Sequence, residues 1–575
     1  MADPVAQLRP MFANAIVAAF GEEYRAVDPA LRPSTFADVQ ANVALALAKP
    51  LKRPPRDVAA AIAAQLTAND AIERVEIAGP GYLNITLRLE HLSRELARVA
   101  ATAALGVAPA ERPDVVVLDY SSPNVAKEMH VGHLRSSILG DALARVLEAL
   151  GHRVIRQNHF GDWGTPFGML IEHLLDGGDA ADEHSVRDLN EFYQAARKKF
   201  DGDPAFAERA RRRVVSLQAG DVETLALWQR LVDGSKRYFA TVYSLLGVTL
   251  TDADIAGESF YNPMLPAVVA DLEALGLARE SDGAICVFPD GFTGREGQPV
   301  PLIIRKQDGG YGYATTDLCA IRHRAKTLGA TRILYVVGSP QRQHLLMVFK
   351  AAQQAHWLAP PVRAEHVAFG SVLGADGKMF KTRSGETVRL IDLLEEAVAR
   401  ARTIADEKNA SLPDDDRAAI ARAVGIGAVK YADLSSDRIK DYVFDWTRML
   451  AFDGNTAPYL QYAHARIRSI IRKGDAGVPP PDAIDIRAPE ERALALKLLA
   501  LPTVLGDVGG SLEPHHLCGY LYDLATTFST FYEKCPVLRA DNDAERRSRL
   551  ALCDLTARVM ARGLSLLGIG APDRM

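Results

Sequence analysis

The chain has 575 residues, a length that predicts about three to five folded units. Hydrophobic residues make up 48% and charged residues 24%, which excludes global disorder. The formal net charge is −5, from 67 Lys and Arg against 72 Asp and Glu, so a protein whose whole surface is a polycation is also excluded. Any polyanionic partner must therefore be held by local basic patches.

The five cysteines contain no C-x-x-C pair, which disfavours a zinc ribbon or a dense disulfide framework and favours reduced thiols. No run of about 18 uncharged apolar residues occurs, and the first residues, Met1-Ala2-Asp3-Pro4, are not a basic segment followed by an apolar core. We therefore expect a cytoplasmic protein that has no membrane contact.

Residues 1–110 combine alanine-rich helical patterning, for example at 39–48, with an alternating run at 82–87 that predicts a half-buried strand. We expect a small α+β domain here. The proline-bounded segment 109–113 is its predicted linker to the next domain.

Residues 114–120 form an apolar run that is typical of a buried parallel strand. A helical period follows from Leu134 to Leu150, Gly151 fits the C-terminal cap of that helix, and 152–157 is a second strand. Residues 114–157 are therefore predicted to form one βαβ unit of a Rossmann-type sheet. The loop after its first strand lies where ligands bind in such sheets.

Residues from about 175 to 300 are polar and mixed, and we interpret them as an insertion between two halves of the sheet. Buried strands are expected to resume at 302–304, 333–337 and 366–373. From Leu390 the pattern is almost wholly helical, with a proline-rich break at 479–481. The predicted fold is α/β, with an α+β N-terminal domain at 1–110, a parallel-sheet domain at 111–385, a helical connecting region at 386–455 and an all-α bundle at 456–575.

The first candidate functional segment is the loop that follows the strand at 114–120. It reads Ser122-Pro123-Asn124 and then His130-Val131-Gly132-His133, at the N-terminus of the predicted helix. The free N–H groups and the dipole of such a terminus favour anions, and two imidazoles one helical turn apart can donate to a phosphate. Gly132 would let a bulky ligand approach the backbone. On its own, a His-x-Gly-His tetrapeptide is more often a surface or capping feature.

The second candidate segment is a glycine-bounded loop, Gly377-Lys378-Met379-Phe380-Lys381-Thr382-Arg383-Ser384-Gly385. Lys378 and Lys381 would suit a reaction that builds up charge on phosphate oxygens and expels pyrophosphate. A solvated basic turn is the alternative for this loop taken alone.

Together the two segments resemble the HIGH and KMSKS signatures of class I aminoacyl-tRNA synthetases, and the chain is similar to the arginyl-tRNA synthetases over essentially its whole length. Val131 replaces the isoleucine of the first signature, and Phe380 and Thr382 replace the two serines of the second. These departures keep both imidazoles and both ammonium groups, so the phosphate chemistry is retained. They do not determine how the second loop closes over a ligand. Further matching strings are 36–40, 159–165, 257–259, 313–317, 454–464 and 572–575.

The resemblance implies ATP-dependent ligation of L-arginine to tRNA(Arg) through arginyl-adenylate, with Mg²⁺ arriving with ATP and no dedicated metal site in the protein. It also implies that His130 and His133 hold the ATP phosphates, while Lys378 and Lys381 neutralise the departing pyrophosphate. Further ATP-site residues implied by the family are Gly132, Asp162 and Trp163.

Recognition of arginine requires carboxylates that meet a planar guanidinium. The resemblance implies three residues for the guanidinium end, namely Glu258, Asp317 and Tyr313. For the α-amino and carboxylate end it implies Ser122, Asn124 and Gln341, with Asp119 in support. Two structural alternatives stay open: Asp119 as a cap or salt-bridge residue, and Asp162 as part of a purely structural turn.

The C-terminal region resembles the anticodon-binding bundle of the family. His464, Arg468 and Arg472 share one predicted helix face and form a candidate phosphate track, although a solvated basic face gives the same pattern. Candidates for contacts with splayed anticodon bases are Tyr459, Tyr462 and Met575, with core packing as the alternative for either tyrosine. Gln40 lies in the segment that would contact the tRNA elbow.

Other functions remain as alternatives. A noncatalytic tRNA-binding paralogue would keep the bundle, and a cysteinyl synthetase would need zinc-ligand cysteines that the chain lacks. A metal-dependent hydrolase would use His130, His133, His159 and Asp162 as ligands. The insertion is short for a hydrolytic editing domain, so we expect none, and we expect a monomer.

Overall fold

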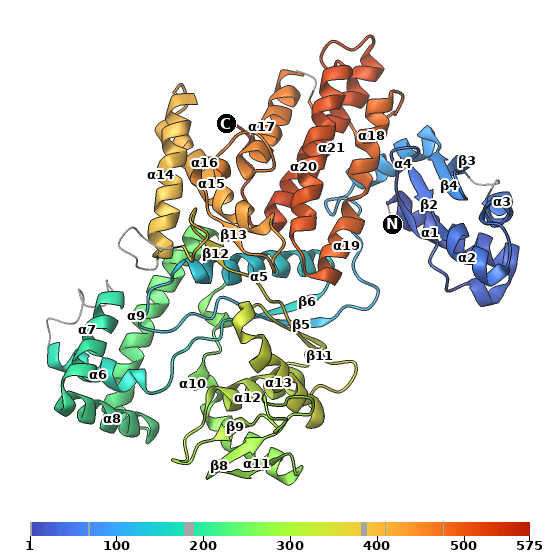
Figure 1. Ribbon diagram of the computed structural model, residues 1–575. Helices are drawn as coiled ribbons and strands as arrows, with labels where there is room; N and C mark the ends of the chain where they lie inside the picture. The colour runs from blue at the N-terminus through green and yellow to red at the C-terminus, as the bar shows by residue number, and fades with distance from the viewer. Residues whose placement is uncertain (1–2, 67–69, 178–188, 381–387, 409, 475–476) are drawn as a thin grey trace.

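The computed structural model describes residues 3–575 apart from 67–69, 178–188, 381–387, 409 and 475–476. Figure 1 shows a small N-terminal domain in blue, a central α/β region in cyan to yellow, and a helical bundle in orange and red that stands on the α/β region. The N-terminal domain lies beside the bundle and away from the lower lobes of the α/β region.

The N-terminal domain is an α+β unit with a four-stranded antiparallel sheet in the order β1-β2-β4-β3. The strand predicted at 82–87 is confirmed as β4. The helix predicted over 39–48 is wrong at its start, because Val39–Ala41 pairs with β4 and the helix begins only at Val43. The elements are α1 (Pro4–Phe20), β1 (Leu31–Pro33), β2 (Val39–Ala41), α2 (Val43–Leu51), α3 (Pro55–Leu66), β3 (Ile72–Ala78), β4 (Tyr82–Leu87) and α4 (Leu89–Ala100).

The central domain contains a four-stranded parallel sheet in the order β11-β10-β5-β6. Its strands are β5 (Val115–Asp119), β6 (Arg153–Gln157), β10 (Arg332–Tyr335) and β11 (Arg363–His366). The predicted βαβ unit is confirmed as β5, α5 (Val131–Ala149) and β6. Gly151, just past α5, has φ +84°, a conformation that glycine adopts without strain. The Rossmann-type parallel sheet is therefore present as expected.

Two predicted strands have other partners than expected. The segment at 302–304 is β9 (Leu302–Arg305), which pairs antiparallel with β8 (Ala284–Val287) and, through it, with β7 (Ala278–Ser281) in a separate small sheet. Ile303 in β9 is 47% exposed, whereas a central parallel strand is covered on both faces. The segment at 366–373 is divided, because β11 ends at His366 and β12 (Val372–Leu373) pairs with β13 (Tyr442–Val443).

Helices form most of the insertion, flank the parallel sheet and make up the regular structure in the described part of residues 456–575, which confirms the predicted all-α bundle. The insertion and flanking helices are α6 (Pro166–Gly177), α7 (Leu189–Gly202), α8 (Pro204–Gln218), α9 (Val222–Leu246), α10 (Glu258–Tyr261), α11 (Leu265–Ala274), α12 (Tyr313–Lys326) and α13 (Arg342–Gln354). The C-terminal helices are α14 (Leu390–Lys408), α15 (Asp414–Leu434), α16 (Trp446–Met449), α17 (Ala457–Lys473), α18 (Pro489–Leu499), α19 (Leu501–Ser511), α20 (His515–Lys534) and α21 (Asp543–Leu566). All five cysteines are free and buried.

Within the described part of the chain, one helical segment, Pro489–Ser511, is long and apolar enough to cross a membrane by length and composition alone. It consists of α18 and α19, which meet at Ala500 and both pack against α20. Leu494, Leu498 and Leu501 on this segment are fully buried. The apolar character of the segment is therefore that of a bundle core.

The N-terminal domain is held to the bundle by an ion pair and by helix packing. α4 packs against α18 (Figure 1). Arg492 of α18 donates to both carboxylate oxygens of Asp38, at 2.7 and 2.5 Å, and also to the carbonyl of Leu87. Asp38 is only 6% exposed on its side chain, so this pair fixes the domain through partly desolvated, charge-assisted hydrogen bonds.

One buried guanidinium joins the carboxyl ends of three parallel strands. Arg324 of α12 is 0% exposed; its Nη2 donates to Asp119 Oδ2 at 2.7 Å and its Nε donates to Gln157 Oε1 at 2.5 Å. The guanidinium carbon also lies 4.9 Å from the ring centroid of Tyr335. Asp119, Gln157 and Tyr335 are the last residues of β5, β6 and β10, so α12 is fixed over the edge of the sheet where ligands are expected.

We predict that Arg324→Leu lowers the free energy of unfolding by roughly 3–5 kcal/mol, because it leaves the Asp119 carboxylate buried without its counter-charge. Arg322→Leu in the same helix is the matched control, since Arg322 pairs with Asp271 at a part-exposed position and such pairs contribute about 1 kcal/mol or less. Calorimetric unfolding of the two variants measures the difference. Equal Tm values for both variants would contradict this assignment.

Candidate active site

The loop between β5 and α5 has an unusual backbone. Ser121, Ser122 and Ala126 have φ of 69°, 48° and 58°, in the left-handed region that non-glycine residues rarely adopt. Such strain persists only where neighbouring groups impose it. Here the Ser121 hydroxyl lies 2.8 Å from the Tyr243 hydroxyl, and the Ser122 N–H donates to Asn158 Oδ1 at 2.9 Å. The loop is thus held in one conformation at the edge of the sheet.

His130 and His133 form a hydrogen-bonded pair at the N-terminus of α5. His130 Nδ1 accepts the N–H of Gly132 at 3.0 Å, His133 Nδ1 accepts the N–H of His130 at 3.1 Å, and the two ring centroids are 4.1 Å apart. Because each Nδ1 is an acceptor, a neutral ring carries its proton on Nε2.

Burial lowers the pKa of both imidazoles, and the pKa of His133 falls to about 3. Both rings are therefore neutral at physiological pH. The nearby Lys127 ammonium lowers the pKa of His130 further. The pair offers two neutral N–H donors next to a helix N-terminus, an arrangement that suits phosphate oxygens.

The His130 ring leaves room only for a glycine at position 132. A Cβ at this position would lie 2.7 Å from Cε1 and 2.9 Å from Nδ1 of His130. Gly132 was expected to admit a ligand close to the backbone, but the nearer physical reason for glycine is the space that the His130 ring occupies. The small residue therefore allows the imidazole to cap the helix.

Ser122 connects the strand end to the neighbouring loop. Its hydroxyl donates to Asp119 Oδ1 at 2.9 Å and accepts the N–H of His159 at 3.2 Å. The other oxygen of Asp119 is held by Arg324. Asp119 therefore contacts Ser122, as its predicted supporting role requires. It also forms the salt bridge that was considered as the structural alternative.

Asn124 is exposed and packs on the segment that contains Asp162. A Cβ at Gly161 would lie 2.2 Å from Asn124 Oδ1, and Val125 donates its N–H to the Gly161 carbonyl at 3.0 Å. The Ser-Pro-Asn loop and the turn at 161–164 are therefore in direct contact, as two walls of one site.

Asp162 is buried and close enough to Glu258 for its charge to act on that carboxyl. Its Oδ1 accepts the N–H of Ser259 at 2.8 Å and its Oδ2 accepts the Ser259 hydroxyl at 2.7 Å. Gly257 has no room for a side chain, because a Cβ there would lie 2.5 Å from Asp162 Oδ2. The carboxylate thus holds the start of α10, which is a structural contact of the kind considered as the alternative to nucleotide binding. Trp163 is half-buried, with its ring 5.7 Å from that of Trp228.

Glu258 is the first residue of α10 and belongs to a group of acidic side chains. Burial, which is the largest cause, and the negative charges of Asp162 and Asp317 together raise its pKa to about 7. Carboxylates that raise one another's pKa in a partly buried site are stabilised by a cation. This is the electrostatic environment that a guanidinium would occupy.

Asp317 and Tyr313 lie one turn apart on α12 and share a partner that sequence reasoning missed. His344 of α13 places Nε2 2.6 Å from Asp317 Oδ2, and its ring centroid is 4.8 Å from that of Tyr313 in an edge-on contact. The spacing in the sequence could have identified His344, because it lies three residues, or about one helical turn, after the predicted site residue Gln341. Tyr313 is 69% exposed, and Gln341 is also exposed.

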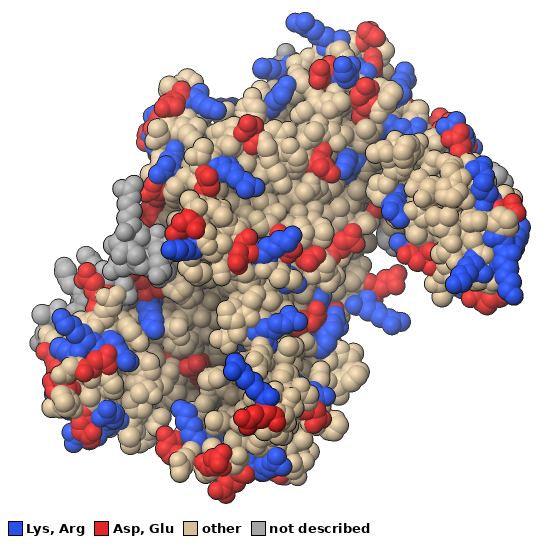
Figure 2. Space-filling view, in the orientation of Figure 1, with Lys and Arg blue, Asp and Glu red and all other residues tan. Residues whose placement is uncertain are grey.

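Figure 2 shows the described surface hollowed between the lobe of α6–α8 and the lobe of α10–α13, with side chains of both charges around the hollow.

Lys378 is exposed on a tight turn, in which Gly374 donates its N–H to the Lys378 carbonyl at 2.8 Å. Lys381 lies outside the described residues.

Two of the candidate anticodon contacts line one cavity. Tyr462, which is 47% exposed, and Met575 border a space of about 390 Å³ between α14, α15 and α17. Lys408 and Phe452 also line it, with the ammonium 3.9 Å from the ring centroid. Tyr459 is half-buried, with its ring 5.7 Å from that of Tyr522. Gln40 donates to Asn84 Oδ1 at 2.8 Å on the N-terminal sheet.

The predicted phosphate track on α17 instead holds the end of the chain. His464 is only 3% exposed and contacts the Pro572 carbonyl at 3.1 Å, so its interpretation as a phosphate contact is wrong. Arg468 Nε lies 3.3 Å from Asp573 Oδ1, and Arg472 donates to the Asp573 carbonyl at 3.1 Å. Arg468 and Arg472 keep exposed surface, and they remain candidates.

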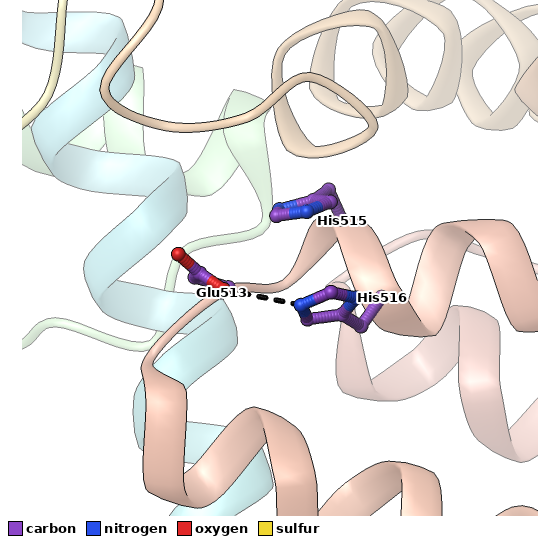
Figure 3. Close-up of side chains that lie close together, drawn as sticks. All are labelled: Glu513, His515 and His516. Carbon is purple, nitrogen blue, oxygen red and sulfur yellow. Dashed lines mark hydrogen bonds and ion pairs between the residues drawn. The ribbon is translucent and has the colours of Figure 1, made fainter. Parts of the chain in front are cut away.

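Across the residues that the structure describes, the group able to hold a metal ion is Glu513, His515 and His516. His516 Nε2 lies 3.1 Å from Glu513 Oε2, the contact that is dashed in Figure 3, and the His515 ring is tilted against the His516 ring with centroids 4.2 Å apart. The group lies at the N-terminus of α20, whose dipole opposes a cation, and the Arg438 charge is close enough to act on both Glu513 and His515. Within the described part of the chain, the ligand set considered for a metal-dependent hydrolase, which includes His130 and His133, does not form such a group.

Comparisons with known proteins extend over the whole chain. Family models match at residues 6–87 (arginyl tRNA synthetase N terminal domain), 96–446 (tRNA synthetases class I (R), catalytic domain) and 460–575 (DALR anticodon binding domain). The chain is 58% identical to an arginine–tRNA ligase from Thermobifida fusca and 51% identical to one from Synechococcus, with 100% of each chain covered.

Solved structures agree with these matches. The arginyl-tRNA synthetase of Plasmodium falciparum superposes with a TM-score of 0.86 at 29% identity, covering 99% of both chains. The Thermus thermophilus arginyl-tRNA synthetase superposes with a TM-score of 0.82 at 28% identity, covering 100% of both chains. By its full-length identity, its three matching domains and its fold, the chain belongs to the arginyl-tRNA synthetase family of class I.

Proposed function

We propose that this enzyme joins L-arginine to tRNA(Arg) through arginyl-adenylate. One observation carries the proposal. The N–H donors of His130 and His133, which suit phosphate, lie near the same strand ends as the carboxylates of Glu258 and Asp317, which suit a cation. The intervening segment 158–162 connects them, because Asn158 bonds to Ser122 and Asp162 bonds to Ser259. The noncatalytic alternative has no support in these residues, since both imidazoles and Lys378 are retained.

In the first step, an oxygen of the arginine carboxylate attacks the α-phosphorus of ATP, and the bond to pyrophosphate breaks. The Nε2–H groups of His130 and His133 would donate to the phosphates, with Gly132 keeping the first ring in place. Lys378 and Lys381 would neutralise the pyrophosphate that leaves. No covalent intermediate with the enzyme is required, so the rate enhancement comes from positioning and electrostatic stabilisation.

Mg²⁺ would enter with ATP and share the charge of its phosphates. The His-Val-Gly-His element presents neutral N–H donors, whereas Mg²⁺ prefers oxygen ligands. The residues beside the phosphates therefore fit a metal carried by the nucleotide better than a metal held by the protein. Asp162 and Trp163 would border the nucleotide, with Asp162 acting mainly by holding α10.

For arginine, Glu258 and Asp317 would meet the guanidinium, with the Tyr313 ring beside it. Lysine would leave part of this acidic group unpaired, because its ammonium cannot form the same planar fork. Ser122, Asn124 and Gln341 would bind the α-amino and carboxylate end, and Asp119 would support Ser122. The second step transfers the arginyl group from the adenylate to a terminal ribose hydroxyl of the tRNA, releasing AMP.

For tRNA, the cavity lined by Tyr462 and Met575 would receive an unstacked anticodon base, with Tyr459 nearby. Arg468 and Arg472 would contact phosphates, and Gln40 would contact the tRNA elbow. We further propose a cytoplasmic monomer with no membrane contact and with domain boundaries near residues 110, 385 and 455.

The proposal predicts exchange of labelled pyrophosphate into ATP that requires both arginine and tRNA, as in the family that the chain resembles. Lysine and cysteine serve as controls and should give background exchange. Exchange with another amino acid would keep the class I chemistry and remove the arginine assignment. No exchange by folded protein that still binds tRNA would favour the noncatalytic alternative.

The acidic group predicts a pH dependence of arginine binding. With the pKa of Glu258 at about 7, its carboxyl is mostly protonated and neutral below that pH and mostly ionised above it, while the guanidinium of arginine stays charged. The KM for arginine should therefore fall roughly tenfold between about pH 6 and about pH 8. Glu258→Gln should raise this KM at the higher pH and flatten the profile. A wild-type KM that does not vary with pH contradicts the role of Glu258.

Gly132→Ala should raise the KM for ATP by about tenfold or more, because the new methyl group displaces the His130 ring from its position. The KM for arginine should change little. Gly506→Ala in α19 is the control, since a Cβ there has open space around it. Steady-state pyrophosphate exchange measures both constants, and an unchanged KM for ATP would show that His130 does not hold the phosphates.

A further inference from the structure

The turn that carries Lys378 is built on a short two-strand platform. β12 pairs in parallel with β13, and Phe444 donates its N–H to the Leu373 carbonyl at 2.8 Å. On the other side of β12, Phe380 donates its N–H to the Val372 carbonyl at 3.1 Å. Three stretches of chain, 371–374, 378–380 and 442–444, therefore lie side by side at the base of the loop.

Phe380 is the side chain that attaches the turn to this platform. Its ring stacks on the ring of Phe444, with centroids 4.7 Å apart and an interplanar angle of 26°. Phe444 is 5% exposed and makes an edge-on contact with Trp446 at 4.8 Å, whereas the preceding loop residue, Met379, is 54% exposed. The loop thus turns one large side chain inward and leaves its neighbour in solvent.

α5, the helix that begins at the histidine pair, also contacts this platform. Arg135 of α5 donates to the Lys440 carbonyl at 3.0 Å, and its guanidinium carbon lies 5.3 Å from the ring centroid of Tyr442. Arg135 is buried and forms an ion pair with Asp433 of α15, at 3.1 Å between Nε and Oδ2. Segment 440–446 therefore contacts both halves of the proposed phosphate site, α5 behind it and the Lys378 turn in front.

We propose that Phe380 is a positioning residue for adenylate formation, which holds the Lys378 turn in register with the histidine pair by stacking on Phe444. Phe380 occupies a serine position of the KMSKS signature, and serine cannot make this stack. In this chain, aromatic packing on segment 440–446 therefore provides the attachment. The inference rests on the proposed function, because the position of Lys378 matters only if the loop acts on ATP phosphates.

The test is pyrophosphate exchange by the full-length enzyme with tRNA present, titrated separately with ATP and with arginine. Phe380→Ser should lower kcat/KM for ATP about tenfold, which is the size expected when an aromatic pair is lost. The KM for arginine should stay within about twofold, because the platform does not touch the acidic group. Phe380→Tyr keeps the ring and should restore activity with ATP.

A double-mutant cycle identifies the partner. Phe444→Leu should reproduce the defect with ATP, and the Phe380→Ser, Phe444→Leu double variant should be no worse than the more impaired single variant. Val443→Ser is the matched control, since Val443 is the adjacent residue of β13 and is 46% exposed; it should behave as wild type.

Three results would overturn the inference while leaving the proposed function intact. These are wild-type kinetics for Phe380→Ser, equal losses with ATP and arginine, and fully additive effects of the two phenylalanine substitutions. No exchange by the wild-type enzyme would instead remove the proposed function, and this inference with it.

Discussion

The Arg324 guanidinium is the contact on which the geometry of the candidate site depends. It binds the last residues of β5 and β6 and lies against the last residue of β10. Asp119 in turn accepts a hydrogen bond from the Ser122 hydroxyl, and that hydroxyl accepts the N–H of His159. A buried charge is tolerated only with its partners in place. The strand ends, the strained loop and α12 therefore hold their positions as one unit.

Burial has opposite effects on the two ends of the site, and both suit the proposed chemistry. It lowers the pKa of His130 and His133, which makes both rings neutral N–H donors. It raises the pKa of Glu258, so that this carboxyl is fully ionised near neutral pH only when a cation lies beside it. The two ends of the proposed site therefore differ in the charge of their side chains, with neutral donors at one end and carboxylates at the other.

The helical C-terminal part contributes more than a platform for tRNA. Arg135 and Asp433 join α5 to α15, and segment 440–446 continues from that contact to the base of the Lys378 turn. α17, which begins shortly after this segment, carries Tyr462, and Met575 at the end of the chain packs beside it at the same cavity. The proposed phosphate site and the proposed anticodon site are thus connected through adjoining elements of one packed structure.

The sequence by itself determined the elements whose signal is local. The apolar run before Ser122 and the helical period after His133 identified β5, α5 and β6, and the spacing of His130 and His133 already placed two imidazoles on one turn. Tertiary structure alone decided which distant residues meet. Arg324 reaches Asp119 across 205 positions, His344 reaches Asp317 across 27, and Val39 joins a strand although its segment looks helical. Periodicity reports which face of an element is buried, whereas the partner of a buried charge, a ring or a strand edge is selected by the packing of the whole chain.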